Sequence, residues 1–365
     1  MLVQTLHNPQ FLFSYKGDTM NYYKITNETE VHRGLKYKTG LNIDPVPFNP
    51  SGDCTTGGIY FSRKDVLIFL DYGPWIRKVT IPKDAQVYKN PGKPEKWKAD
   101  KVILGERTKI TAKIIEKLLN EGADPKAHNS LPLRRAAEMG RIDIVKLLIP
   151  ISDPKASNSS ALRWAAEEGH TEIVRLLIPV SNPEADNSLA LQWAAEGGCI
   201  EIVKLLIPVS DPKAQNSSAL QRAAGNGHTD IVKLLIPMSV PKICNSLALQ
   251  WAAERDRIDI VKLLIPVSDP KASNSSALRR AAGRGRIDIV KLLIPVSDPK
   301  ANNSIALQCA AENGHTDIVK LLIPVSNPKA KNSIALQCAA ENGHTDIVKL
   351  LIPVSDAKAD DRALL

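Results

Sequence analysis

Aromatic residues and cysteines are scarce in this sequence of 365 residues. Phenylalanine, tryptophan and tyrosine together make up 5% of it, so we expect a core built from leucine, isoleucine, valine and alanine. The five cysteines are odd in number, and no pair has the C-x-x-C or Cys/His spacing of a metal site. This pattern predicts free thiols in a reducing compartment and favours neither a metal nor any other cofactor.

Long apolar runs are also missing, and none approaches the ~20 residues that a membrane-spanning helix needs. Residues 1–19 lack the basic start of a signal peptide. We expect them to be a loosely ordered leader, with a true start at Met20 as the alternative. We therefore expect a soluble, intracellular, monomeric protein that does not contact a membrane. The net charge of +9 allows an acidic protein or a nucleic acid as partner and selects neither.

What the sequence has in abundance is an internal repeat, which is the first feature to seek in a chain of this length. An Asn-Ser pair recurs at intervals of 29 residues and defines eight full units. A partial unit precedes them at residues 112–127, and a truncated one follows at 360–365. The array is therefore expected to span residues 109–365. The asparagines that open the units are Asn129, Asn158, Asn187, Asn216, Asn245, Asn274, Asn303 and Asn332.

The unit that starts at Asn303 predicts a pair of helices. Asn303 or Ser304 is expected to cap the first helix with a side-chain oxygen. Gly314 follows that helix, where a left-handed residue commonly ends one. Asp317 lies near the positive end of the second helix, and Pro324 cannot continue it. One such pair cannot bury its own apolar face, so the stability of the array has to come from stacking neighbouring units.

The repeated pattern A-L-x-x-A-A-E-x-G-H-x-D-I-V-K-L-L resembles the two-helix part of the ankyrin repeat. This resemblance covers about residues 109–365 and implies an α-solenoid scaffold that binds one or more proteins. The ankyrin unit has ~33 residues, and the four missing here come from the connector. We therefore expect tight turns in place of hairpin fingers, and partner contacts along a concave helical face. The shortened unit and residues 22–27 also resemble the ankyrin-repeat proteins of giant DNA viruses, which implies a role in the cytoplasm of a host cell.

Candidate partner contacts lie around the Ala-Ala pair of each unit. One position before the pair holds Trp, Arg or Cys, which predicts partial burial. Tryptophan and arginine are enriched at binding hot spots, although packing at the edge of the array explains the position equally well. Residues 303–326 are identical to residues 332–355, so we expect specific contacts in the earlier units. The candidates are Glu138, Met139, Trp164, Glu167, Glu168, Trp193, Trp251, Arg255, Arg280 and Arg284.

Two other features of the array invite a chemical interpretation. Gly-His pairs place a histidine at the same point of four units, where it could hold a metal or hydrogen-bond the backbone between helices. Other units have Arg or Cys there, which favours the structural role. Arginines crowd the units that start at Asn245 and Asn274, and their partner could be an acidic protein or a phosphate backbone. They could equally form a solvated face balanced by Glu254, Asp256, Asp259 and Asp288. Because no aromatic residues are interleaved with them, nucleic-acid binding is the weaker alternative.

Residues 20–108 predict a small α+β domain, with strands near 58–61, 75–81 and 101–104 and a short helix at 65–72. The segment Gly57-Gly-Ile-Tyr-Phe-Ser62 is similar to a strand of the ADP-ribosyltransferases that use a His-Tyr-Glu set. That resemblance implies that His32 holds a nicotinamide ribose, Tyr60 stacks on the nicotinamide ring and Glu106 is the catalytic acid. An aromatic platform and a carboxylate would stabilise an oxocarbenium-like centre. The alternatives are a degenerate, inactive relative and a buried strand with two packing aromatics.

Overall fold

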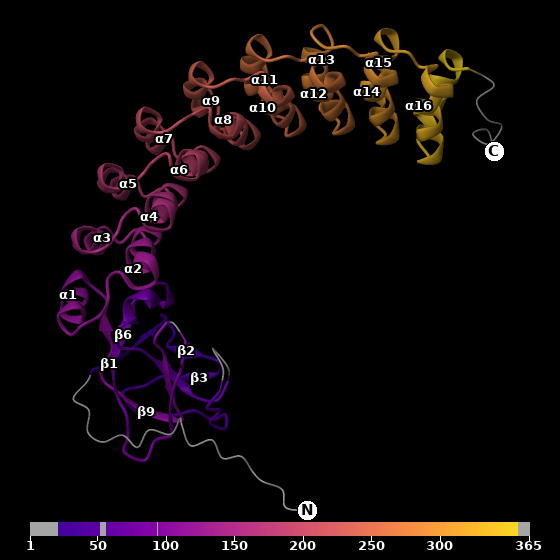
Figure 1. Ribbon diagram of the computed structural model, residues 1–365. Helices are drawn as coiled ribbons and strands as arrows, with labels where there is room; N and C mark the ends of the chain where they lie inside the picture. Colours follow the sequence, from indigo (N-terminus) through magenta and orange to yellow (C-terminus); the bar gives the residue numbers. More distant parts are fainter. Residues whose placement is uncertain (1–20, 52–55, 93, 357–365) are drawn as a thin grey trace, which may run out of the picture. The chain divides into compact units, whose positions relative to one another are not determined.

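The computed structural model describes residues 21–51, 56–92 and 94–356 (Figure 1). They fall into two compact units that divide between Asn182 and Pro183. The first unit contains a strand-rich domain followed by helical repeats, and the second contains helical repeats alone. The chain is therefore mainly α-helical with a small α+β domain before the array, as predicted. The predictions made for residues 1–19, Cys54 and residues 360–365 lie outside the described residues.

The strand-rich domain is built on antiparallel sheets. The main sheet has the order β1-β6-β9-β4, with β10 also paired to β6, and a second sheet has the order β5-β8-β7. The strands predicted near residues 58–61, 75–81 and 101–104 are β5, β6 and β9. The strands are β1 (Tyr22–Thr26), β2 (Val31–His32), β3 (Leu35–Lys36), β4 (Gly40–Ile43), β5 (Ile59–Phe61), β6 (Trp75–Thr80), β7 (Val87–Lys89), β8 (Trp97–Ala99), β9 (Lys101–Leu104) and β10 (Thr108–Lys109).

The core of this domain lies where these sheets face one another. In β9, Val102 and Leu104 are buried whereas Ile103 between them is exposed, because successive side chains of a strand point to opposite faces. Ile59 and Phe61 of β5 pack into the same cluster. The predicted helix is the 3₁₀ helix η1 (Val66–Tyr72), which buries most of its aliphatic side chains.

The strand-rich domain is anchored to the first repeats within the first unit. The Tyr23 hydroxyl donates a hydrogen bond of 2.6 Å to Glu121, which follows helix α1 (Ala112–Asn120). Arg135 of α2 (Ala127–Glu138) forms an ion pair of 2.9 Å with Asp71 of η1. The predicted boundary between residues 108 and 109 falls inside β10, which pairs with β6. The strands and the first repeats therefore form one structural unit.

Each repeat consists of a long helix, a seven-residue helix and, in most units, a 3₁₀ turn. The long helices are α2 (Ala127–Glu138), α4 (Ala156–Glu167), α6 (Ala185–Glu196), α8 (Ala214–Asn226), α10 (Ile243–Glu254), α12 (Ala272–Gly283), α14 (Ala301–Glu312) and α16 (Ala330–Glu341). The short helices are α3 (Ile142–Leu148), α5 (Thr171–Leu177), α7 (Ile200–Leu206), α9 (Thr229–Leu235), α11 (Ile258–Leu264), α13 (Ile287–Leu293), α15 (Thr316–Leu322) and α17 (Thr345–Leu351). The 3₁₀ turns are η2 (Ile149–Ile151), η3 (Ile178–Val180), η4 (Ile207–Val209), η5 (Ile236–Met238), η6 (Ile265–Val267), η7 (Ile323–Val325) and η8 (Ile352–Val354).

The array is held together by the apolar faces that the repeat pattern predicted. Ala306, Leu307 and Ala310 of α14 are buried, as are Ile318 and Leu322 of α15. In the second compact unit, which begins at Pro183, Figure 1 shows α10, α12, α14 and α16 side by side in one row and α11, α13 and α15 in another. Alanine has a small side chain, so it lets the long helices approach one another closely.

Tight turns connect the repeats, and the prediction that hairpin fingers are missing is confirmed for the described residues. No strand occurs between Ala112 and Asp356. After α15 the chain forms η7, so Pro324 ends the α-helix but the chain continues as a 3₁₀ turn. Across the same described residues, none of the helices is both long and apolar enough to cross a bilayer.

The start of each long helix differs from the prediction. Asn302, Asn303 and Ser304 have φ angles of 44°, 57° and 62° and form a left-handed turn before the right-handed helix. The Asn-Ser pair therefore does not cap its own helix. Instead, the Ser304 hydroxyl accepts a hydrogen bond of 2.7 Å from the backbone N–H of Asn327 in the next connector. The pair is repeated because its serine satisfies a connector N–H in every unit, which the capping interpretation missed.

This left-handed turn makes a testable prediction at Lys331, an exposed residue with φ of 47°. Left-handed backbone costs a residue with a Cβ roughly 1–2 kcal/mol, and glycine avoids that cost but gains entropy in the unfolded chain. Lys331→Gly should therefore raise the free energy of unfolding by about 1 kcal/mol, measured by urea denaturation followed by circular dichroism. Lys331→Ala, which keeps the Cβ, is the control and should change little. Equal stability of the two variants would contradict the left-handed assignment.

Candidate functional site

The position before each Ala-Ala pair, here called position seven, lies half-buried at the end of a long helix. It holds Trp164, Trp193 and Trp251 in three units, and all three are intermediate in exposure. The partial burial predicted from the mixture of Trp, Arg and Cys is therefore confirmed.

Position seven is matched to a residue of the preceding unit, three residues further along its long helix. Arg222 forms an ion pair with Glu196, and Arg280 forms one with Glu254. Where position seven is Trp251, the matching residue is Gly225, and a Cβ there would lie 3.3 Å from the indole ring. In these repeats a large ring meets a glycine and a guanidinium meets a carboxylate, whereas Trp164 is matched to Glu138 and Cys309 to Gly283. Packing between repeats therefore accounts for Arg222, Trp251 and Arg280, and it leaves these side chains only partly buried.

Four of the predicted contact residues come together around one carboxylate on α10 and α12. We call Trp251, Glu254, Arg255, Arg280 and Arg284 the Trp251 cluster. The Arg255 guanidinium lies 5.7 Å from the centroid of the Trp251 ring, within range of a cation–π interaction. Arg280 and Arg284 both bond Glu254, the latter at 3.1 Å. Two arginines therefore share one carboxylate, while Arg255 instead donates a hydrogen bond of 3.1 Å to the side-chain oxygen of Asn226. The cluster carries an excess of positive charge.

Glu254 fixes the orientation of the two arginines that bond it. Burial raises the pKa of this carboxyl, but the hydrogen bond and charge of Arg280, followed by those of Arg284, lower it below its usual value. Glu254 therefore stays ionised near neutral pH. The Arg284 side chain remains 65% exposed while it bonds Glu254. The cluster thus presents cationic groups that are oriented before any partner arrives.

The other predicted contact residues do not join this cluster. Trp193 lies on α6, in the compact unit that begins at Pro183. In the compact unit that ends at Asn182, Glu138 accepts a hydrogen bond of 3.0 Å from Arg135, and Met139 beside it is half-buried. Glu167 and Glu168 are both exposed at the end of α4. Their role as partner contacts stays a prediction.

The turn histidines have a structural role, as the sequence favoured. The ring Nε2 atom hydrogen-bonds a backbone carbonyl of the preceding unit, at 3.0 Å from His170 to Glu138 and at 2.8 Å from His228 to Glu196. His315 and His344 repeat this contact. Since a carbonyl only accepts, each Nε2 carries the hydrogen. Within the described part of the chain, no group of three His, Cys, Asp or Glu residues could hold a metal ion.

Sequence reasoning missed the partner of each histidine ring, which is a glycine in the preceding unit. The His344 ring lies against Gly314, where a Cβ would come within 2.7 Å of it. In another unit Arg286 takes the place of the histidine, and Asp256 takes the place of the glycine and pairs with it at 3.6 Å. The signal was present in the sequence as Gly followed 30 residues later by His. The sequence alone did not show that these two residues touch, because their contact depends on how neighbouring repeats stack.

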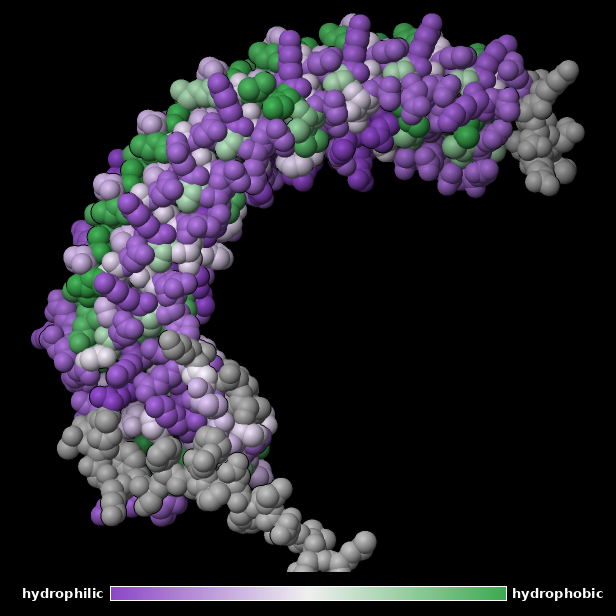
Figure 2. Space-filling model, viewed as in Figure 1, coloured by the Kyte–Doolittle hydropathy of each residue, from purple (hydrophilic) through white to green (hydrophobic). Residues whose placement is uncertain are grey.

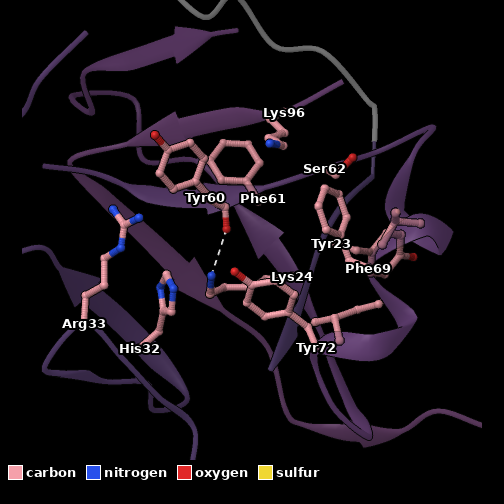
Figure 3. Close-up of a pocket in the computed structure, with 12 residues that line it drawn as sticks. Tyr23, Lys24, His32, Arg33, Tyr60, Phe61, Ser62, Phe69, Tyr72 and Lys96 are labelled. Carbon is pink, nitrogen blue, oxygen red and sulfur yellow. Dashed lines mark hydrogen bonds between the residues drawn. The ribbon is translucent and has the colours of Figure 1, made fainter. Parts of the chain in front are cut away.

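The strand-rich domain contains a cavity of about 210 Å³ (Figure 3). His32 and Tyr60, which the transferase resemblance singled out, both line it. Glu106 does not line it and is exposed beyond the end of β9. The structure therefore brings together two of the three residues. Among the described residues that line the cavity, none is a carboxylate, and the lining is Tyr23, Lys24, Ile25, His32, Arg33, Tyr60, Phe61, Ser62, Val66, Phe69, Tyr72 and Lys96.

The electrostatic environment of the cavity is positive. Burial, followed by the charges of Lys24 and Arg33, lowers the pKa of His32, so this ring is neutral at neutral pH. Burial also lowers the pKa of Lys24 to about 8. The sequence analysis did not identify Lys24 or Arg33, because a lysine inside a strand normally points to solvent.

Exposed apolar side chains recur in the turns after the short helices. Val209 and Met238 are examples, and in Figure 2 green atoms reappear at intervals along the rows of helices, separated by polar residues. Single exposed apolar residues are normal on a protein surface and define no binding site by themselves. The Trp251 cluster is therefore the better candidate for partner contact.

Comparison with known proteins agrees with this architecture. The family described as "Ankyrin repeats (3 copies)" matches residues 108–189, 133–216, 162–246, 191–274, 220–303 and 278–362. Two proteins of Acanthamoeba polyphaga mimivirus named for ankyrin repeats are 37% identical over 140 residues and 34% identical over 129 residues. Each alignment covers 34% of this chain, and 46% and 39% of the respective relatives. An uncharacterized protein of the same virus is 36% identical over 129 residues, 34% of this chain and 94% of its own length. The chain thus spans less than half of the two named relatives.

Proposed function

Because the chain belongs to the ankyrin-repeat family, whose repeats mediate protein–protein interaction, we propose that it is a scaffold that grips an acidic segment of a partner protein at the Trp251 cluster. Its relatives are encoded by a giant virus, and we propose that it acts on a protein of the host cell. The observation that carries the proposal is the set of arginines oriented around Glu254 beside a half-buried tryptophan.

The composition of the cluster supports a protein partner. Trp and Arg are the residue types that most often dominate the energy of a protein interface. Arg280 is held between two helices and Arg284 reaches solvent, so the cluster has a fixed base and an exposed rim. Carboxylates of a partner would bond the outer nitrogens of these guanidinium groups without displacing Glu254.

A nucleic-acid partner fits the same cluster less well. Arg255 covers the face of Trp251, so that the ring offers less area for stacking on a base. The nearby Arg286 is paired with Asp256, which would repel a phosphate backbone. A short acidic peptide needs only two or three cations and tolerates such neighbours.

Charge reversal at the exposed arginines tests the proposal. We expect Arg255→Glu/Arg284→Glu to weaken binding at least tenfold, because it places carboxylates against those of the partner. The measurement is quantitative capture from host-cell lysate by the full-length protein, followed by titration of each purified partner.

A matched control makes the outcome specific. Lys262→Glu/Lys291→Glu introduces the same change of charge on α11 and α13 of the same repeats, at lysines that are more than half exposed. Partners retained by the control and lost from the arginine variant would support the proposal. Equal capture by both variants, or captured material that is mainly nucleic acid, would rule it out.

A further inference from the structure

The cavity of the strand-rich domain is lined by residues that the scaffold function does not use. Three cations line it, Lys24 from β1, Arg33 after β2 and Lys96 before β8. No carboxylate is among the described lining residues, and Asp44, which acts on the cavity from outside the lining, raises the pKa of His32 less than burial, Lys24 and Arg33 lower it. A cavity with this surplus of positive charge suits an anion.

Lys24 is the most deeply placed of these cations. It is 8% exposed, its amine donates a hydrogen bond of 2.9 Å to the backbone oxygen of Tyr60, and it lies 4.5 Å from the centre of the Tyr37 ring. None of these contacts supplies a negative charge. An ammonium group buried without a counter-ion costs free energy, and a bound anion would recover it. Its lowered pKa, about 8, agrees with this environment.

Aromatic rings form much of the remaining wall. Tyr60, Phe61, Phe69 and Tyr72 line the cavity, and Figure 3 shows His32 and Arg33 to one side of the Tyr60 and Phe61 rings and Lys96 to another. The Tyr72 ring packs edge-on against His32 at 6.0 Å while its side chain is largely exposed, so it lies at the mouth. Such walls accept a planar ring by stacking.

The size of the cavity limits the ligand. Its volume of about 210 Å³ is below the roughly 300–1,000 Å³ of pockets that hold drug-sized compounds. A smaller hollow of about 20 Å³ shares Lys24, His32 and Tyr72 with it and extends it only slightly. A ligand with a single base, sugar and phosphate therefore fits this space better than a dinucleotide does.

We propose that the cavity between β1, β2, β5 and η1 is a binding site for a nucleoside monophosphate, with the base against the aromatic wall and the phosphate bonded by Lys24 and Arg33. The described lining residues include no carboxylate, so we assign the cavity to binding of the ligand. This inference is independent of partner binding by the array, since it uses none of the residues of the Trp251 cluster.

Calorimetric titration of the full-length protein with each of the four common nucleoside monophosphates tests the site. At least one should bind saturably with one site per chain. The matching nucleoside and inorganic phosphate should each bind at least tenfold more weakly, because each satisfies only one half of the site. Nicotinamide adenine dinucleotide serves as the larger competitor and should bind more weakly than the monophosphate.

Two variants locate the binding within the cavity. Arg33 is exposed, so Arg33→Gln should fold normally and weaken binding about tenfold, the loss expected for one charge-assisted hydrogen bond. Lys24→Met replaces the buried amine by an apolar side chain of similar length and should abolish detectable binding. Arg284→Gln, in the array, should leave it unchanged. The proposal is overturned if no monophosphate binds, if phosphate alone binds as tightly, if the dinucleotide is bound more tightly or cleaved, or if both cavity variants bind like the wild type.

Discussion

Replacing Glu30 with glutamine is expected to destabilise the strand-rich domain by about 3–5 kcal/mol, the usual cost of removing one partner from a buried ion pair. The Glu30 carboxylate accepts hydrogen bonds of 2.7 and 2.8 Å from Nε and Nη2 of Arg77, whose side chain is 4% exposed. The remaining guanidinium nitrogen donates to Thr39 and to the backbone oxygen of Gly105. Glutamine keeps the shape of the side chain and leaves the guanidinium buried without a counter-ion.

The same ion pair predicts a dependence of stability on pH. The hydrogen bond from Arg77 lowers the pKa of Glu30 below its unfolded value of about 4.3. A carboxyl whose pKa is lower in the folded state stabilises the protein above its unfolded pKa, and this contribution is lost as the pH falls through the folded pKa. The difference in stability between the wild type and Glu30→Gln should therefore be largest near neutral pH and should shrink below about pH 4.

Hydrogen exchange of the β6 amides, read by mass spectrometry on the full-length protein, measures this local stability. The double variant Glu30→Gln/Arg77→Met removes the unpaired charge and should recover part of the loss. Asp84→Asn breaks the exposed ion pair with Lys101 and should leave exchange in β6 unchanged. Two results would refute the assignment of the lost stability to the buried ion pair. One is that Asp84→Asn affects β6 exchange as much as Glu30→Gln does. The other is that the stability difference between the wild type and Glu30→Gln does not change with pH.

The helical array was predictable from the sequence because its physical cause is periodic. A buried face that recurs every 29 residues identifies the two helices, and Gly314 and Pro324 mark their ends. The left-handed turn at residues 302–304 was not predictable. Asparagine and serine favour helix caps and left-handed turns alike, and only the position of the Asn327 N–H decides between the two.

The strand-rich domain was less predictable, since its strands have two to six residues and depend on long-range pairing. Tyr60 and His32 were recognised through a short motif, and the structure places both in one cavity. Glu106 was assigned only by its position in the chain, and it lies outside the lining. Lys24 had no local signal at all, because the burial of a strand lysine is decided by the sheets packed around it.

The contact between units is the origin of the second large effect, at Gly314. This residue has a φ of 78°, and a Cβ on it would lie 2.7 Å from the His344 ring of the next unit. Gly314→Ala should therefore cost about 2–4 kcal/mol, the sum of left-handed strain and the displacement of a packed ring. Gly343 occupies the same position in the identical unit that follows, with a φ of 72° and no atom within 4 Å of its Cβ position. Gly343→Ala carries the strain alone and should cost roughly 1–2 kcal/mol.

A double-mutant cycle between Gly314 and His344 isolates the contribution of the contact. His344→Ala removes the ring and its hydrogen bond of 3.0 Å to the Glu312 carbonyl. In that background Gly314→Ala should cost no more than Gly343→Ala does in the wild type, because both then report only backbone strain. Urea denaturation of the four proteins, followed by circular dichroism, gives the coupling energy. A coupling near zero would mean that the histidine and the glycine of neighbouring units do not hold the stack together. The expected value, about 1–2 kcal/mol, would assign the recurring Gly…His pair to cohesion between repeats and leave partner binding to the exposed cluster on α10 and α12.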